Sequence, residues 1–374
     1  MNVGIALLTL FPGRVGGAET YVRGLLGAFA DGNGPELATA LVSSRSGPSL
    51  EEFAGPHLKL ANVDAYQPGD SNFTRLLAME SARFRKRRIA RGVPDGIDVI
   101  HYPVTVPIPE LAGVPKVVTI LDTQHRDLPQ MFSPAERTFR RWAYDRAARQ
   151  ADAVITNTAF SADRIVHHLG ISRDKIHVIQ LGIDHDRFTP EGPAPDIVGL
   201  PQRYIYFPAN AWPHKNHRRL FEAFARIDDP DLHLVLTGRE MGSKELTDLG
   251  PRVVHLGHVP ESQVAALYRG AQAMVFPSLY EGFGFPPLEA MACGCPVAVS
   301  NNGAAAEVCG DAALRFDPNS VGEITDSINR VAGDEQLSDR LRGLGITQAA
   351  QFTWERTARM HNEAYLRAAE VASG

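Results

Sequence analysis

The sequence predicts an α/β protein made of two doubly wound, Rossmann-like domains that face a central cleft. The chain has 374 residues, which is more than one ordinary hydrophobic core accommodates. In both halves, short apolar runs alternate with amphipathic stretches, a pattern typical of βαβ units and a parallel sheet. A tract rich in Pro and Gly at 189–203 interrupts this alternation and predicts the linker.

The first domain is predicted over residues 1–190 and begins with a buried strand. Its N-terminal stretch has an apolar core without a preceding basic segment, which favours a strand over a signal peptide. We expect strands at 3–8, 37–42, 99–102, 117–121, 153–156 and 176–181. We expect helices at 18–30, over the basic run 83–91, and at 134–149.

The second domain is predicted over residues 191–352 and repeats the alternation. We expect its strands at 204–207, 232–237, 253–256, 273–276 and 296–299, and its helices at 216–227, 261–269 and 286–293. The tail, 353–374, reads as a helix that Thr353 caps, with Glu355 in the first turn.

Composition narrows the class of protein. Hydrophobic residues make up 44% and charged residues 22%, as in soluble globular proteins, and no apolar run approaches the roughly 20 residues that span a bilayer. Cys293, Cys295 and Cys309 form no zinc-like pair, so we expect buried thiols in a reducing cytoplasm. We therefore predict a cytoplasmic protein.

Charge is unevenly distributed along the chain. Residues 1–180 carry 21 Lys and Arg against 18 Asp and Glu, whereas residues 181–374 carry 17 against 25. The basic half includes the run 83–91 and the arginine-rich helix expected at 134–149. A solvated helix face explains such runs most simply; the sharper hypothesis is an anionic partner, such as the inner face of a membrane or a phosphate-linked acceptor. The acidic whole chain and the lack of a recognised module argue against nucleic acid.

The segment 278–289 gives the clearest indication of a ligand-binding site. An apolar strand leads into a glycine-bearing loop, and a helix start near Pro286 follows, with Glu281 and Glu289 eight positions apart. Carboxylates accept hydrogen bonds from sugar hydroxyls, while a helix start and bare glycine amides favour phosphate. The alternative is a structural helix start with Glu289 as an acid of the first turn.

The stretch PSLYEGFGFPPLEAMACGCPVAVS, residues 277–300, resembles the signature of the retaining family-4 glycosyltransferases, which have the GT-B fold. The family's paired glutamates, separated by seven residues, match Glu281 and Glu289. Further similarity lies at 16–19, 207–220, 256–271 and 352–358. The resemblance implies a hexosyltransferase that uses a nucleotide diphosphate sugar, and a tail helix that crosses back to the N-terminal domain.

The resemblance also implies roles for individual residues of the donor site. Glu281 contacts the hydroxyls of the donor sugar, Glu289 contacts the ribose, and Lys215 binds the diphosphate. The main-chain amides along the sugar and phosphate belong to Gly282, Phe283 and Gly284. The loop with His258 and Val259 matches the segment that contacts the base, although His258 is as readily explained as an ordinary loop histidine.

The expected donor site also includes two glycines and a residue that replaces an arginine found in many family members. Gly16 and Gly17 end the first strand-to-helix loop and let the backbone approach a ligand, although the spacing is not that of a dinucleotide fingerprint. Many family members carry an arginine a few residues before the lysine; this chain has none at 208–211. Asn210 or Arg239 is the expected substitute, and a surface role for Arg239 is equally open.

The clearest departure from the family lies at residues 121–122. Many members have His-Asp there, whereas this chain has Leu121 and Asp122. His125, four residues on, is the candidate to replace the absent histidine, and Asp122 is a candidate to orient the acceptor, although a carboxylate at a strand end is often a loop cap. Both are therefore candidate catalytic residues, together with Lys215 and Glu281.

No metal and no cofactor are expected. The two DxD sequences, at 184–186 and 229–231, do not converge on the glutamate loop, and Lys215 with helix starts suffices for a leaving diphosphate. The stretch His214-Lys215-Asn216 resembles that of family members that use GDP-mannose or related donors, which favours mannosyl transfer to a glycan, lipid-linked or small-molecule hydroxyl, with UDP-sugar donors still open. A sugar-nucleotide epimerase and a non-catalytic sugar-nucleotide binder are the rivals.

Overall fold

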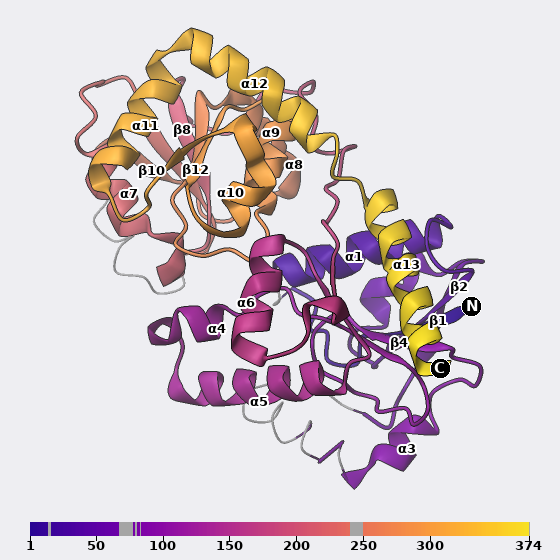
Figure 1. The fold of residues 1–374 in the computed structure, drawn as a ribbon. Coiled ribbons are helices and arrows are strands. Elements are labelled where there is room, and N and C mark those ends of the chain that lie inside the picture. The colour runs from indigo at the N-terminus through magenta and orange to yellow at the C-terminus, as the bar shows by residue number, and fades with distance from the viewer. Residues whose placement is uncertain (14–15, 67–77, 79–80, 83, 240–249, 374) are drawn as a thin grey trace. The chain divides into compact units, whose positions relative to one another are not determined.

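The computed structural model describes residues 1–13, 16–66, 78, 81–82, 84–239 and 250–373 (Figure 1). These residues form two compact units. The N-terminal unit comprises Met1–Gly182 together with Trp354–Gly374, and the C-terminal unit comprises Ile183–Thr353. Each unit has a parallel sheet of its own, so the predicted pair of doubly wound α/β domains is confirmed.

The N-terminal unit is built on a parallel sheet with the strand order β3-β2-β1-β4-β5-β6-β7. Its strands are β1 (Asn2–Ala6), β2 (Leu37–Val42), β3 (Leu58–Asn62), β4 (Val99–Tyr102), β5 (Lys116–Thr119), β6 (Ala153–Thr156) and β7 (Ile176–Val178). From β1 the chain winds outward to β2 and β3, and it then returns to β4 on the other side. The carboxyl ends of β1 and β4 therefore flank the point where the winding reverses.

Helices and short helical turns connect these strands. They are α1 (Gly17–Ala30), η1 (Pro48–Phe53), α3 (Lys86–Ala90), α4 (Gln124–Asp127), η2 (Pro129–Met131), α5 (Pro134–Gln150), α6 (Ala159–Leu169) and η3 (Arg173–Lys175). Helix α5 begins with a capping box in which Ser133 and Glu136 exchange side-chain and main-chain hydrogen bonds. The predicted basic helix is observed as α3, and its first predicted residue, Arg83, lies outside the described residues.

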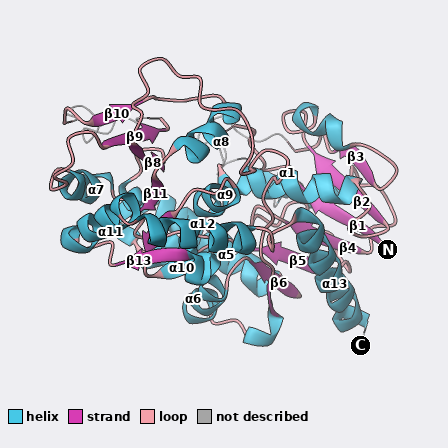
Figure 2. Cartoon of the chain, turned by 90° about the horizontal axis from the view of Figure 1, so that it is seen from above, coloured by secondary structure: helices cyan, strands magenta, loops and turns pink. Residues whose placement is uncertain are grey.

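The tail helix α13 (Trp354–Ser373) packs on the N-terminal unit, as expected (Figure 2). Side chains alternate across a strand, so the β4 and β5 residues His101 and Thr119 face α13 while their neighbours face the opposite core. Gly24 of α1 makes room for the tail, because a Cβ atom there would lie 2.1 Å from Cε2 of Trp354.

A buried chain of hydrogen bonds joins α13 to α1 and the sheet. The Tyr21 hydroxyl lies 2.8 Å from His361 Nε2 and 2.9 Å from Thr119 Oγ1. His101 Nε2 lies 2.8 Å from Thr119 Oγ1, and its Nδ1 lies 2.8 Å from the Tyr365 hydroxyl. Each of these side chains is at most 1% exposed, so every polar atom relies on its neighbour in the chain.

The C-terminal unit repeats the design with the strand order β10-β9-β8-β11-β12-β13, all parallel. Its strands are β8 (Tyr204–Pro208), β9 (His233–Thr237), β10 (Val253–His255), β11 (Ala273–Phe276), β12 (Val297–Ser300) and β13 (Ala313–Phe316). Its helices and turns are η4 (Pro213–Lys215), α7 (His217–Phe224), α8 (Glu261–Gly270), α9 (Phe285–Ala292), α10 (Gly303–Cys309), η6 (Gly310–Ala312), α11 (Val321–Gly333) and α12 (Glu335–Ala349).

The boundary between the units lies at Ile183, eight residues before the expected one. The main-chain N–H of Ile183 donates to the Phe352 carbonyl at 3.1 Å, and the Phe188 ring packs edge-on against Tyr268. These contacts attach 183–190 to the C-terminal unit. The described residues include no helix long and apolar enough to cross a membrane.

Candidate functional site

The C-terminal sheet reverses its winding between β8 and β11. In doubly wound sheets, ligands bind outside the carboxyl ends of the strands at this switch point. The loop 209–216 follows β8 and the loop 277–284 follows β11, and these two loops contain Lys215 and Glu281. The topology alone therefore brings the two predicted residues to one edge of the sheet.

Lys215 and Glu281 form an ion pair at this edge. The Lys215 Nζ atom lies 2.7 Å from Glu281 Oε1, and the two side chains are 16% and 14% exposed. The same ammonium lies 4.9 Å from the centre of the Phe276 ring, the last residue of β11. A partly buried cation fixed over an aromatic face is suited to an anionic ligand, and the adjacent carboxylate to hydroxyl groups.

Main-chain and amide hydrogen bonds fix the two loops to each other. The Leu279 N–H donates to the His214 carbonyl at 2.8 Å. Asn216 occupies the N-cap position of α7, but its side chain makes no cap hydrogen bond. It instead donates to the carbonyls of Pro277, at 3.0 Å, and Pro318, at 2.8 Å, because its left-handed backbone (φ 64°) turns the amide toward the neighbouring loop.

Gly284 ends the glutamate loop and is the N-cap residue of α9. Its φ of 125° is a conformation that side chains disfavour, and a Cβ atom there would lie 3.2 Å from the Cα of Ala305 in α10. The ring of Phe283 packs edge-on against Phe285 and Phe352, which holds the preceding backbone in place. Gly282 is half-buried beside them.

Glu289 lies on α9, but not in its first turn as expected, because the helix begins at Phe285. Its half-buried carboxylate accepts a hydrogen bond from the Tyr268 hydroxyl at 3.3 Å. Burial raises the pKa of Glu289 to about 7, so the group is poised between its neutral and ionised forms at physiological pH.

The remaining donor-site candidates of this unit lie on three adjacent loops of the same edge. The Arg239 N–H donates to Asn210 Oδ1 at 2.7 Å, which joins the loops after β9 and β8. The Gly238 N–H donates to the Gly257 carbonyl at 2.8 Å, which joins the loop that contains His258 and Val259. The side chains of Asn210, Arg239 and His258 are exposed, while Val259 is half-buried.

Gly16 and Gly17 belong to the N-terminal unit. Both are exposed, and they connect the loop after β1 to α1 at the carboxyl edge of that sheet. The Gly16 carbonyl accepts the Glu19 N–H at 2.8 Å, and Glu19 Oε2 in turn accepts the Gly13 N–H at 2.7 Å. The first-turn acid thereby organises the loop that leads to the glycine pair.

Asp122 and His125 follow β5 in the same unit. Asp122 Oδ1 accepts the Gln124 N–H at 2.9 Å, as a loop-capping carboxylate does. The His125 ring is fully buried and packs edge-on against Tyr144 with 4.7 Å between ring centres. Burial, and secondarily the positive charges of Arg140 and Arg126, lower its pKa to about 4. Neither ring nitrogen has a hydrogen-bond partner, so His125 reaches a substrate only if its surroundings open.

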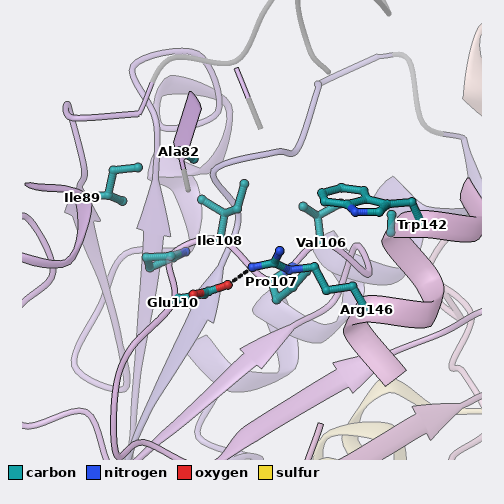
Figure 3. Close-up of a pocket in the computed structure, with 10 residues that line it drawn as sticks. Ala82, Ile89, Val106, Pro107, Ile108, Glu110, Trp142 and Arg146 are labelled. Carbon is teal, nitrogen blue, oxygen red and sulfur yellow. Dashed lines mark hydrogen bonds and ion pairs between the residues drawn. The ribbon is translucent and has the colours of Figure 1, made fainter. Parts of the chain in front are cut away.

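A hollow of the N-terminal unit lies elsewhere (Figure 3). Its walls are mostly apolar and come from α3, α5 and the loop after β4, and the Glu110–Arg146 ion pair crosses one side. None of the predicted site residues lines it.

Both DxD sequences serve as turns. Asp184 Oδ1 accepts the N–H groups of Asp186 and Arg187, each at 3.1 Å, and Asp229 Oδ1 accepts the Asp231 N–H at 3.0 Å. Among the described residues, no three His, Cys, Asp or Glu side chains gather as a metal site would require.

Sequence reasoning missed two residues of the site. Tyr268 holds the Glu289 carboxylate, and Phe276 lies beneath the Lys215 ammonium. Both occupy apolar positions of α8 and β11, and the sequence pattern predicts that they belong to the hydrophobic core. Only the pairing of β8 with β11 and the contact of α8 with α9 give them a second role.

Two family models match consecutive parts of the chain. The model described as Glycosyltransferase Family 4 matches residues 15–187, and the model described as Glycosyl transferases group 1 matches residues 197–346. The first span covers most of the N-terminal unit and ends shortly after the unit boundary at Ile183, and the second lies within the C-terminal unit.

Three curated proteins illustrate the similarity. The MMP alpha-(1->4)-mannosyltransferase of Mycolicibacterium hassiacum is 30% identical over 299 residues, which cover 73% of this chain and 71% of that enzyme. The D-inositol 3-phosphate glycosyltransferase of Paenarthrobacter aurescens is 28% identical over 94% of this chain and 93% of that enzyme. The O-antigen chain mannosyltransferase B of Escherichia coli is 33% identical, but the match spans 58% of this chain and only 60% of that enzyme.

Solved structures share the fold over almost the full length. Sucrose-phosphate synthase from Thermosynechococcus elongatus superposes with a TM-score of 0.76 at 20% identity, over 98% of both chains. Anabaena HepE, solved with UDP and glucose, superposes with a TM-score of 0.70 at 18% identity, over 97% of this chain and 98% of that one.

Proposed function

Because this chain belongs to the family-4 glycosyltransferases, which have the GT-B fold, we propose that it transfers a hexose, with mannose favoured, from a nucleotide diphosphate sugar to an acceptor hydroxyl. The observation that carries this proposal is the Lys215–Glu281 pair at the switch point of the C-terminal sheet. One side chain suits a diphosphate and the other suits sugar hydroxyls, and they are held 2.7 Å apart.

Each residue has a separate task in this reaction. The Lys215 ammonium neutralises the negative charge that grows on the leaving diphosphate as the bond to the anomeric carbon breaks. Glu281 accepts hydrogen bonds from sugar hydroxyls and so orients that carbon. The main chain of Gly282, Phe283 and Gly284, together with the start of α9, lies beside the sugar and phosphates.

Glu289 is proposed to bind the ribose of the donor. Two ribose hydroxyls can donate to one ionised carboxylate, and the Tyr268 hydroxyl donates to the same carboxylate at 3.3 Å. The exposed loops that contain Asn210, Arg239 and His258 are the proposed surroundings of the base and phosphates.

The transfer is proposed to retain the anomeric configuration by front-face substitution. The bond to the leaving phosphate oxygen breaks, the acceptor oxygen bonds to the same face of the sugar, and the leaving phosphate takes the acceptor proton. No base stands ready in the described geometry of the N-terminal unit, because the His125 ring is buried and Asp122 caps its own loop. We propose that Asp122 positions the acceptor, and that His125 contributes only when its buried surroundings open.

The donor and acceptor classes follow from chemistry and from the relatives. Two of the named relatives are mannosyltransferases, and one acts on an inositol phosphate according to its name. We therefore favour GDP-mannose, followed by UDP-hexoses, and an acceptor that is a glycan, glycolipid or small-molecule glycoside. The reaction is proposed to need neither metal nor cofactor, because Lys215 supplies the positive charge.

We place the reaction in the cytoplasm. Cys293, Cys295 and Cys309 are all buried free thiols, as is usual in a reducing compartment.

Ligand-induced thermal stabilisation tests the donor assignment first. The protein is melted with GDP, UDP and their hexose conjugates, with and without EDTA, because a ligand that binds only the native state raises the melting temperature. A shift with one nucleotide series that EDTA leaves unchanged is expected. No shift with any nucleotide would overturn the donor site.

Product analysis then separates the enzymes. Sugar appearing on an added acceptor supports transfer, and its anomeric configuration tests retention. Turnover of a UDP-sugar to its epimer without acceptor would replace the transferase with an epimerase. Binding without any turnover would leave a sugar-nucleotide-binding protein.

A further inference from the structure

The segment around α3 differs from the rest of the N-terminal surface in its charge. Residues 83–91 contain six Lys and Arg and no acid. Four of these arginines, Arg85, Arg87, Arg88 and Arg91, are described as exposed, and none of them forms an ion pair with an acid of the described residues. Elsewhere on this unit, some arginines have a carboxylate partner, as Arg23 has Glu52 and Arg126 has Asp145.

An exposed aromatic ring accompanies the arginines. The Phe84 side chain is 90% exposed. Among the described residues, the other exposed aromatic side chain is that of Trp212, which is 45% exposed. Ile89, by contrast, is 2% exposed and belongs to the core, so it anchors α3 to the unit and leaves the arginines and Phe84 outside. Figure 1 shows α3 at the periphery of its unit, away from α1 and α13.

We propose that Phe84, Arg85, Arg87, Arg88 and Arg91, here named the α3 surface, dock the enzyme on an anionic lipid bilayer. Clusters of basic residues bind anionic headgroups, and an aromatic ring beside them enters the interface between headgroups and acyl chains. A partner that offers only phosphates would match the arginines and leave the phenyl ring in water. The exposed ring is therefore the feature that favours a bilayer over a nucleic acid.

Charge sets the strength and the salt dependence of this docking. Each arginine near an anionic surface contributes about 1 kcal/mol, which is roughly a fivefold change in partitioning. The attraction extends over about 10 Å at 0.1 M salt and about 3 Å at 1 M salt, so binding is expected to be reversed by salt. Docking is independent of the donor chemistry, because no residue of the α3 surface belongs to the proposed donor site.

Co-sedimentation with vesicles tests the charge component. The full-length protein is mixed with vesicles of phosphatidylcholine alone, or with about a third of phosphatidylglycerol, at 0.1 M and 0.5 M salt. We expect binding only to the anionic vesicles and only at the lower salt. The double variant Arg87→Gln/Arg88→Gln is expected to partition about 25-fold more weakly. The matched control is Arg359→Gln/Arg367→Gln, which removes two exposed arginines from α13 of the same unit and is expected to bind as the native chain does.

A tryptophan reporter tests insertion of the ring. In Phe84→Trp, the added fluorescence is expected to shift to the blue with anionic vesicles, while Val371→Trp, at a 70% exposed position of α13, is expected not to shift.

Equal binding to neutral vesicles, full binding by the Arg87→Gln/Arg88→Gln variant, or unshifted fluorescence from bound Phe84→Trp protein would each overturn the proposal. Equally tight binding to duplex DNA through the same arginines would replace the bilayer with a general polyanion. Melting curves of the variants show whether each is folded, and donor-induced stabilisation reports separately on the proposed function.

Discussion

Lys215 and Glu281 are 66 residues apart in the chain, and their side chains meet at 2.7 Å where β8 and β11 end. Their loops are also joined by the Leu279–His214 main-chain bond and by the Asn216 amide. The carboxylate thus neutralises the ammonium and holds it in place. A bound diphosphate would compete for the same ammonium, which frees Glu281 to accept sugar hydroxyls.

Lys215→Met is expected to damage catalysis far more than folding. Loss of one preorganised charge next to a leaving group typically lowers kcat by about 10²- to 10³-fold. Stability should fall by roughly 1–3 kcal/mol, because Glu281 loses its partner in a partly buried position. Turnover of the donor and urea denaturation measure the two effects.

The double variant Lys215→Met/Glu281→Gln separates charge pairing from chemistry. Removing both charges should restore most of the stability and none of the turnover. If the double variant regained activity, the ion pair would be structural and the donor assignment of both residues would be wrong. Arg218→Met, on the exposed Arg218–Glu222 pair of α7, is the matched control and is expected to change neither property appreciably.

The fold and the donor loop could be predicted from the sequence because their signals are local. Apolar runs that alternate with amphipathic stretches predicted the parallel sheets, and the spacing of Glu281 and Glu289 predicted a loop followed by a helix. Strand β3 escaped prediction because Lys59 and Asn62 interrupt its apolar character. The first-turn placement of Glu289 was wrong because α9 begins at Phe285, before the expected start near Pro286.

Long-range partners could not be predicted. The sequence around Glu289 does not indicate that Tyr268 is its partner. The sequence around Tyr21 likewise does not indicate His361, which lies 340 residues away. Such pairs depend on the order of strands and on the docking of α13, which local patterns do not encode. The burial of His125 likewise arises from Tyr144 and the packing of α4 on α5, so a loop histidine in the sequence is a core residue in the structure.

Glu289 predicts a pH dependence of nucleotide binding. Its pKa is raised by burial to about 7, and only the ionised carboxylate accepts hydrogen bonds from two ribose hydroxyls. Affinity for the nucleotide should therefore rise as pH increases from about 6 to about 8. Glu289→Gln should bind more weakly above pH 7 and show little pH dependence; titration calorimetry at several pH values measures both.

The raised pKa of Glu289 also predicts that the stability of the ligand-free protein falls as pH rises, whereas nucleotide affinity increases. The native state binds more protons at Glu289 than the unfolded state between pH 4.5, the ordinary pKa, and about pH 7, so stability falls as pH rises through this window. Glu289→Gln should lose this trend and be more stable at pH 8 by roughly 2 kcal/mol. A variant with unchanged pH dependence in both measurements would contradict the shifted pKa.

The hydrogen-bond chain under α13 predicts acid sensitivity of the N-terminal unit. His361 Nδ1 faces the Thr357 carbonyl at 2.8 Å and must carry the proton, so Nε2 accepts from the Tyr21 hydroxyl. Thr119 then donates to Tyr21, His101 Nε2 donates to Thr119, and Tyr365 donates to His101 Nδ1. One proton arrangement therefore satisfies every member with both imidazoles neutral.

Protonation breaks this arrangement. Burial lowers the pKa of His361 to about 4, below the ordinary value of 6.5, so the unfolded state binds more protons between these values. Stability should therefore be lost as pH falls from about 6.5 to about 4, by roughly 3 kcal/mol from His361 alone. Tyr21→Phe should cost about 1–3 kcal/mol at pH 7, because His361 Nε2 and Thr119 lose a buried partner. Chemical denaturation between pH 4 and pH 8 measures both effects, and an acid-insensitive native chain would contradict the assigned tautomers.

Gly284→Ala is expected to disturb the glutamate loop specifically. The left-handed backbone with φ of 125° disfavours any side chain, and the new Cβ would lie 3.2 Å from the Ala305 Cα, a main-chain atom that cannot rotate away. A loss of roughly 1–3 kcal/mol of stability is expected from the strain. Relief of that strain would also move Gly282 and Phe283, so donor affinity should fall with it.

Gly333→Ala at the end of α11, where a Cβ meets nothing within 4 Å, is the matched control and should leave donor binding unchanged. Native donor affinity in Gly284→Ala would show that the loop backbone does not contribute to the site.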